Sequence, residues 1–171
     1  LEKARLAQSG ALRKAGDFDG AELLLEKVLE TSPNDLIGAL AQRAEIATAR
    51  KDWGTAVDRW EHVISACGAA GQPIPKSAAA QLEKARLAQS GALRKAGDLD
   101  AALLTLSALL SANPKHSAAQ NEVAEIHAEK SDYQKALACY ANVLELDRGR
   151  VSRVLQGMAA TFKACGKPEH A

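Results

Sequence analysis

The chain has 171 residues, a formal net charge of +1 and a hydrophobic fraction of 47%, of which aromatic residues supply only 4%. This length suits one compact domain or a short array of repeats that each bury a face on the next. The balanced charge gives no electrostatic reason to bind nucleic acid, and no apolar run reaches the roughly 18–20 residues of a membrane span. We therefore expect neither a nucleic-acid partner nor insertion into a membrane.

The cysteines and the N-terminus suggest a location. Cys67, Cys139 and Cys165 are odd in number and lack motif spacing, which favours reduced thiols in a cytoplasmic protein. No signal peptide is visible. Leu1 already stands inside a helical pattern, so the chain resembles a piece of something longer.

One segment organises the whole chain. LEKARLAQSGALRKAGD occupies residues 1–17 and recurs letter for letter at 82–98, with a looser similarity beyond each copy. Each copy predicts a helix, a break at Ala-Gly-Asp, and a second apolar helix. Weaker versions of the same pattern follow both copies. The sequence therefore predicts an all-α array of helical hairpins.

The first hairpin is expected over about 2–35. Gly16 tolerates the left-handed turn that ends the first helix, Asp17 or Asp19 can cap the second helix, and Pro33 stops it. We expect the first helix to turn one small-residue side inward, namely Ala4, Ala7, Ala11, Leu12 and Ala15. The inner face of the second helix is expected to comprise Ala21, Leu24, Leu25, Val28 and Leu29.

The remaining hairpins follow in order. The array is expected to continue at about 37–70, 83–116 and 117–150, with a partial fifth hairpin at 152–171. Between the second and third lie an inserted loop, clearest from Gly68 to Pro75, and a backward helix extension, together about 71–82. The identical copies stand 81 residues apart, which leaves 13 residues beyond two periods of about 34. The duplicated unit is therefore a pair of hairpins plus this insert.

These residues resemble the tetratricopeptide repeat family. Gly16 to Ala21, followed by Leu25, Val28-Leu29 and Pro33, is similar to the second half of one such repeat. The resemblance implies a right-handed superhelix of stacked hairpins, with Ala21 at the close helix crossing and Leu25 as the bulky residue. The first helix departs from the family pattern, because Arg5 and Gln8-Ser9 occupy apolar places.

No catalytic or metal-binding pattern accompanies the repeats. The four histidines, His62, His116, His127 and His170, lack zinc spacing, and neither a G-x-S-x-G motif nor a P-loop occurs. The rings at 18, 53, 60, 133, 140 and 162 all fall at repeat-packing places. We expect a chain that is not an enzyme and uses no metal or cofactor.

The opening helix of each hairpin is the expected binding surface. In the family these helices line a concave groove that holds a peptide or a partner's helix. The groove residues expected here are Lys3, Arg13, Lys14, Glu45, Lys84, Arg94, Lys95, Asn121, Glu125 and Glu129. Equally, these charges could form an ordinary solvated surface. A carboxylate clamp is disfavoured, because Gly10, Glu45, Gly91 and Glu125 hold the places where that subtype has asparagine.

The leading functional prediction is a non-catalytic scaffold that binds a protein or peptide partner. One alternative is an accessory domain of a larger bacterial enzyme, such as a glycosyltransferase or sulfotransferase. Another is a homo-oligomer that assembles through exposed solenoid ends. Seventeen identical residues are also compatible with an engineered array.

Overall fold

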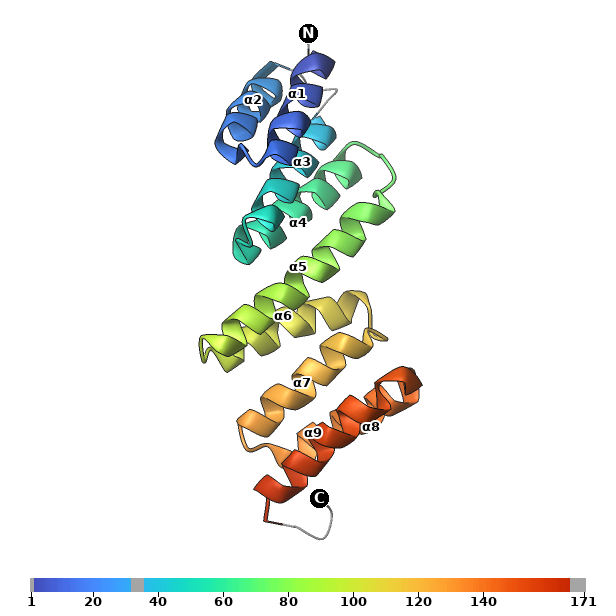
Figure 1. The fold of residues 1–171 in the computed structure, drawn as a ribbon. Coiled ribbons are helices and arrows are strands. Elements are labelled where there is room, and N and C mark those ends of the chain that lie inside the picture. Colours follow the sequence, from blue (N-terminus) through green and yellow to red (C-terminus); the bar gives the residue numbers. More distant parts are fainter. Residues whose placement is uncertain (1, 32–35, 167–171) are drawn as a thin grey trace. The chain divides into compact units, whose positions relative to one another are not determined.

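The protein is all-α, as predicted. The computed structural model describes residues 2–31 and 36–166, without the side chains of Glu2 and Lys76, and within these ranges it contains helices and no strand (Figure 1). Pro33, the predicted stop of the first hairpin, and the predicted fifth turn after Gly166 lie outside the described residues.

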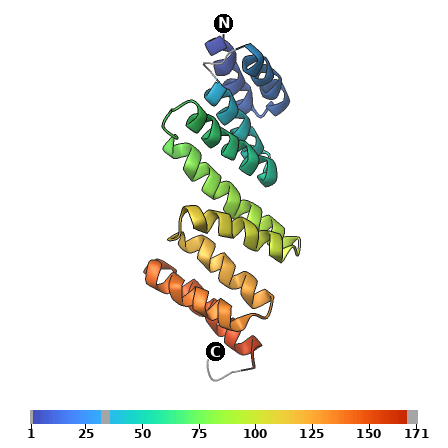
Figure 2. The ribbon, with the colours of Figure 1, turned by 180° about the vertical axis from the view of Figure 1, so that it is seen from behind.

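The helices follow one another as antiparallel pairs joined by short turns (Figures 1 and 2). The first helix of each pair is called here the opening helix. The α-helices are α1 (Glu2–Ala15), α2 (Phe18–Thr31), α3 (Leu36–Ala49), α4 (Trp53–Ala69), α5 (Lys76–Lys95), α6 (Leu99–Ala112), α7 (Ser117–Glu129), α8 (Tyr133–Leu146) and α9 (Val151–Ala164). A 3-10 helix, η2 (Arg148–Arg150), precedes α9.

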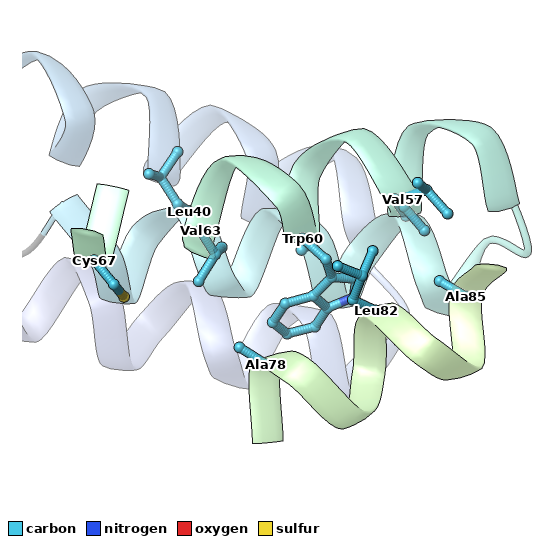
Figure 3. Packing of buried hydrophobic residues seen from close by; sticks show 11 residues of the cluster. Leu40, Val57, Trp60, Val63, Cys67, Ala78, Leu82 and Ala85 are labelled. Carbon is cyan, nitrogen blue, oxygen red and sulfur yellow. The ribbon is translucent and has the colours of Figure 1, made fainter. Parts of the chain in front are cut away.

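Two compact units divide the chain. Unit 1 is Leu1–Ala85 and unit 2 is Arg86–Ala171, so α5 contributes its first half to unit 1 and its second half to unit 2. The largest core of unit 1 lies around Trp60 of α4, which extends toward the α5 segment carrying Ala78, Leu82 and Ala85 (Figure 3). In unit 2 the cores gather around Leu106 of α6 and Tyr140 of α8.

Small residues allow the paired helices to cross closely. Ala21, Ala56, Ala102 and Ala136 occupy the same place in the four second helices, and all have an exposed fraction of 0%. The residue four positions later is bulky and buried in every case, as the repeat pattern predicts. Those residues are Leu25, Trp60, Leu106 and Tyr140.

The turn inside each pair is left-handed at one equivalent position. Gly16 and Gly97 have φ of 86° and 85°, and the non-glycine residues Lys51 and Ser131 have φ of 58° and 62°. An L-residue pays a steric cost for this conformation, whereas glycine does not. The repeat geometry therefore requires a left-handed residue in each of these four turns, and only two of the turns have glycine there.

The aspartate after each turn starts the next helix. Asp17 Oδ1 accepts a hydrogen bond from the Gly20 amide at 2.9 Å, so Asp17 is the cap rather than Asp19. Asp52 accepts from the Thr55 amide at 3.2 Å, and Asp98 from the Ala101 amide at 3.1 Å. These bonds satisfy donors that a helix N-terminus leaves unpaired. The hydrogen bond from Thr55 also lowers the pKa of Asp52.

The predicted inner face of the first opening helix is wrong. Ala4, Ala7, Ala11 and Ala15 are exposed in α1, whereas Leu6 and Leu12 pack on the core around Leu25 and Ser9 is fully buried. Within unit 1, α1 is covered by α2 and by the next opening helix, α3. No element of the described residues covers its alanine side.

The insert also differs slightly from the prediction. Helix α4 runs to Ala69 and therefore includes Gly68, where the loop was expected to begin. Helix α5 begins at Lys76 and has 20 residues, whereas α1 has 14.

Within the described part of the chain, no helix combines the length and apolar character needed to cross a membrane.

Candidate protein-binding site

Facing charges join successive opening helices within each unit. In unit 1, Arg13 of α1 pairs with Glu45 of α3 at 2.8 Å between Nη2 and Oε2. In unit 2, Arg94 of α5 pairs with both Glu125 and Glu129 of α7. The predicted groove residues of these helices thus meet as ion pairs between neighbouring helices.

The unit 2 pairing is the denser of the two. Arg94 Nε and Nη2 both donate to Glu129 Oε1, at 2.8 and 2.5 Å, and Nη1 donates to Glu125. Glu125 Oε1 also accepts from Asn121 Nδ2 at 2.7 Å and from Arg153 Nη2 of α9 at 3.4 Å. Burial opposes the charge on Arg94, but hydrogen bonds from Glu129 and Glu125 outweigh it and raise the Arg94 pKa. Burial likewise opposes the charge on Glu125, yet Arg94 lowers its pKa. Both shifts favour the charged forms of Arg94 and Glu125.

A pocket of about 290 Å³ opens beside this network in unit 2. We call it the tyrosine pocket, because both tyrosines of the chain line it. Its lining residues are Arg94, Glu125, Ala128, Glu129, Tyr133, Tyr140, Gly157, Ala160, Thr161 and Ala164. Small side chains on α7 and α9 create the hollow. An added Cβ at Gly157 would stand 2.6 Å from the Tyr140 hydroxyl oxygen, so the ring approaches the α9 backbone closely.

Unit 1 has an equivalent pocket of about 250 Å³, called here the tryptophan pocket. Its lining residues are Arg13, Glu45, Thr48, Ala49, Trp60, Gln81 and Lys84. Trp60 takes the place of Tyr140, and its indole Nε1 donates to Thr48 Oγ1 at 3.2 Å. In unit 2 the residue equivalent to Thr48 is Ala128, which offers no such acceptor. The two pockets thus share a framework and differ in the polar groups they present.

A second hollow of unit 2 shares Arg94 and Glu125 with the tyrosine pocket. It measures about 220 Å³ and also includes Asn121, Glu122 and Arg153. Asn121 is only 3% exposed, and its Oδ1 is buried without a hydrogen-bond partner in the described structure. Burial raises the pKa of Glu122, although a hydrogen bond with Ser90 opposes that shift.

The predicted groove residues divide into two classes. Lys3, Lys14, Lys84 and Lys95 are exposed. By contrast, Arg13, Glu45, Arg94 and Glu125 are partly buried and paired across helices, Asn121 is buried, and Glu129 joins the network from an exposed position. The structure gathers the last three of the predicted residues, Asn121, Glu125 and Glu129, together with Arg94, into one cluster in unit 2.

Sequence reasoning missed several members of this cluster. Tyr133 and Tyr140 were interpreted only as packing residues, yet both line a pocket. Glu122 was absent from the prediction, although it contacts the buried Ser90 hydroxyl. The available signal was Ser90 itself, a polar residue inside an otherwise packing face, which requires a polar partner opposite it.

Two of the histidines serve local structure. His116 Nδ1 accepts from the Ala119 amide at 3.1 Å and caps α7. His127 Nδ1 lies 3.4 Å from Asp132 Oδ2 at the start of α8. Within residues 2–31 and 36–166, no group of three His, Cys, Asp or Glu side chains is placed to hold a metal ion.

Comparisons with known proteins agree with this architecture. A tetratricopeptide repeat family model matches residues 87–150. No curated protein matches the sequence. Among solved structures, the YrrB protein, described as a TPR protein with an unusual peptide-binding site, has a TM-score of 0.59 at 17% identity over 97% of this chain and 78% of its own.

Two further structures share the fold. The MamA protein has a TM-score of 0.63 at 17% identity, covering 98% of this chain and 84% of its own. A tetratricopeptide repeat protein from Parabacteroides merdae has a TM-score of 0.65 at 18% identity, covering 99% of this chain and 62% of its own. Residues 87–150 thus match the tetratricopeptide repeat family, and the paired helices and crossing alanines show the same fold in the rest of the described residues.

Proposed function

We propose that this chain is a non-catalytic interaction module that binds an extended segment of another protein along its opening helices. The main support is the cluster of unit 2, where ion pairs between neighbouring helices frame a hollow lined by two tyrosines and small residues. Aromatic anchors with a polar rim are typical of protein-binding surfaces. The YrrB description, a TPR protein with a peptide-binding site, supports the same use of this fold.

The chemistry of the surface favours recognition over reaction. Arg94 donates its hydrogen bonds to Glu125 and Glu129. A general acid or base needs a pKa near the working pH, whereas Arg94 and Glu125 are shifted away from neutrality. These groups therefore suit the fixing of a bound segment's position.

Substitutions that test this proposal must spare the ion pairs between the helices. Reversing the charge of Arg13 or Arg94 would break ion pairs inside the array and lower its stability. Lys14 and Lys95 follow them in the sequence, are exposed, and are both among the predicted groove residues. The double variant Lys14→Glu/Lys95→Glu therefore changes the surface with the least damage to the fold.

The experiment probes an array of random peptides, each roughly ten residues long, with the wild-type chain and this variant. A matched control, Lys27→Glu/Lys115→Glu, makes the same charge change at exposed positions outside the opening helices. We expect the peptides that bind the wild-type chain to bind the first variant at least about fivefold more weakly. Their affinity for the control variant should equal that for the wild type. Equal loss in both variants, or no loss in either, would reject the opening helices as the binding surface.

A further inference from the structure

We infer that the tyrosine pocket receives a basic side chain, arginine or lysine, of the bound segment. This inference rests on the proposed function, because it assigns one contact within that binding surface. Three charged residues line the pocket, namely Arg94, Glu125 and Glu129, so its lining carries an excess of one negative charge. The tryptophan pocket is lined by Arg13, Glu45 and Lys84 and has the opposite excess.

Arg94, the cation in the pocket lining, leaves one carboxylate oxygen of Glu129 open to a ligand. Both hydrogen bonds from Arg94 to Glu129 end on Oε1, and no donor among the described residues reaches Oε2. The Glu129 side chain is 43% exposed, so a ligand can approach this oxygen. Glu125, in contrast, uses both of its oxygens, one for Arg94 and the other for Asn121 and Arg153.

The tyrosines supply the second part of the site. Tyr140 is only 2% exposed, and it lines the pocket together with Tyr133. A tyrosine hydroxyl in the lining can accept a hydrogen bond from a cationic N–H group of the ligand. The ring of Tyr133, which is partly exposed, also favours a cation over its face. Burial, followed by the charge of Glu125, raises the Tyr140 pKa, so this hydroxyl stays protonated and neutral.

Size and charge exclude the other common occupants. The volume of about 290 Å³ falls at the lower limit for whole small-molecule sites and suits one side chain. An acidic side chain would meet Glu125 and Glu129 while Arg94 is already neutralised by them. A purely apolar side chain would leave Glu129 Oε2 unpaired.

The two tyrosines make a direct test possible, because they are the only ones in the chain. With ring-labelled tyrosine, NMR of the full chain reports the pocket alone while N-acetyl-arginine methylamide is added. The isosteric neutral probe is N-acetyl-citrulline methylamide. We expect saturable shifts of both tyrosine signals with the arginine probe and at least about tenfold weaker binding of citrulline. The Trp53 and Trp60 indole signals of unit 1 should stay in place.

Two variants examine the assignment of roles. Glu129→Gln should weaken the arginine probe at least about tenfold, and Tyr140→Phe should weaken it while keeping the ring. Absent shifts, equal response to citrulline, or unchanged binding to Glu129→Gln would overturn the inference. If peptide binding depends on Lys14 and Lys95 but the arginine probe does not shift the tyrosine signals, the proposed function stands and this inference fails. Tyrosine shifts with the arginine probe but no binding to any peptide would show a cation pocket, would reject the proposed function, and would leave no bound segment to supply the basic side chain.

Discussion

The same 17-residue segment occurs twice in the chain, and its two copies differ in burial and in ion pairing. In residues 1–17 the Ala4 side chain is exposed, whereas the equivalent Ala85 is fully buried against α4. Arg13 pairs with one carboxylate, and its duplicate Arg94 pairs with two. Local sequence sets the helix and its turn, and the neighbouring helix decides which face is buried and what each charge meets.

The neighbours of the duplicated segment differ in a systematic way. Opposite the buried Ser9, Gln42 donates Nε2 to the Leu6 carbonyl at 3.0 Å and presents Oε1 to the serine hydroxyl at 2.6 Å. Opposite Ser90 stands Glu122, the carboxyl analogue of that glutamine. Unit 1 also has an ion triad, formed by Glu22, Arg43 and Arg59. Apolar residues take the equivalent places in unit 2. These exchanges make each unit a control for the other.

The largest expected effect concerns that triad. Glu22 of α2 bonds Arg43 of α3 at 2.8 Å and also Arg59 of α4, and is only 16% exposed. Glu22→Leu would leave two arginines without their partner, so we expect the free energy of unfolding of unit 1 to fall by about 2 kcal/mol. Urea denaturation followed by tryptophan fluorescence measures this, because Trp53 and Trp60 both lie in unit 1.

Unit 2 supplies the control for this prediction. The equivalent residues there are Leu103, Val123 and Cys139, all partly buried and packed on apolar clusters. The triple variant Glu22→Leu/Arg43→Val/Arg59→Cys should recover stability to within about 1 kcal/mol of the wild type, because buried ion groups and apolar groups are often interchangeable as complete sets. A triple variant as unstable as the single one would show that the triad itself stabilises unit 1.

A smaller effect is expected at Glu122. Its pKa is raised by burial, so the folded state holds the proton more tightly than the unfolded state. Stability from this group is therefore complete at pH below the ordinary carboxyl pKa and declines as pH rises through the raised value. Glu122→Gln can donate to the Leu87 carbonyl as Gln42 does to Leu6, and should stabilise unit 2 by about 1 kcal/mol at neutral pH.

The measurement is urea unfolding followed by tyrosine fluorescence, excited where tryptophan contributes least, at a series of pH values. The difference between variant and wild type should shrink as pH falls below the carboxyl range, because both side chains are then neutral. Gln42→Glu makes the reverse exchange in unit 1 and should destabilise it at neutral pH. A pH-independent difference would contradict the assigned role of Glu122.

The smallest effect is expected in the turns. Lys51 and Ser131 hold φ of 58° and 62° where the duplicated segments have glycine. Lys51→Gly and Ser131→Gly should each raise the free energy of unfolding by about 0.5–1 kcal/mol, because glycine relieves the left-handed strain at some cost in chain entropy. Gly16→Ala and Gly97→Ala should lower it by a similar amount. Thermal unfolding compares the four variants, and loss of stability on placing glycine at Lys51 would refute the strain argument.

Much of the fold could be predicted from residues that act locally. Gly16 and Gly97 mark left-handed turns, Asp17 caps the helix after its own turn, and Ala21 and Ala102 mark the helix crossings. The inner face of α1 could not be predicted, because its alanine side resembles a packing face and is covered only where another hairpin lies against it. Ala4 and Ala85 show this difference for one sequence.

The candidate site was predicted in part for the same reason. Arg94, Glu125 and Glu129 were expected on one surface, and the structure pairs them. Tyr133 and Tyr140 fit repeat packing so well that their second role, lining a hollow next to Gly157, left no mark in the sequence. A pocket depends on the absence of side chains from neighbouring helices, and no single segment encodes that absence.

By itself the sequence determined that this chain forms paired helices of one repeating type, because turn, cap and crossing residues act within a few positions of one another. The packing of the helices, in contrast, sets which carboxylates Arg94 meets, which alanines are covered, and that both tyrosines line a hollow. Those outcomes depend on helices roughly 30 residues apart, whose facing side chains are chosen by packing rather than by local preference.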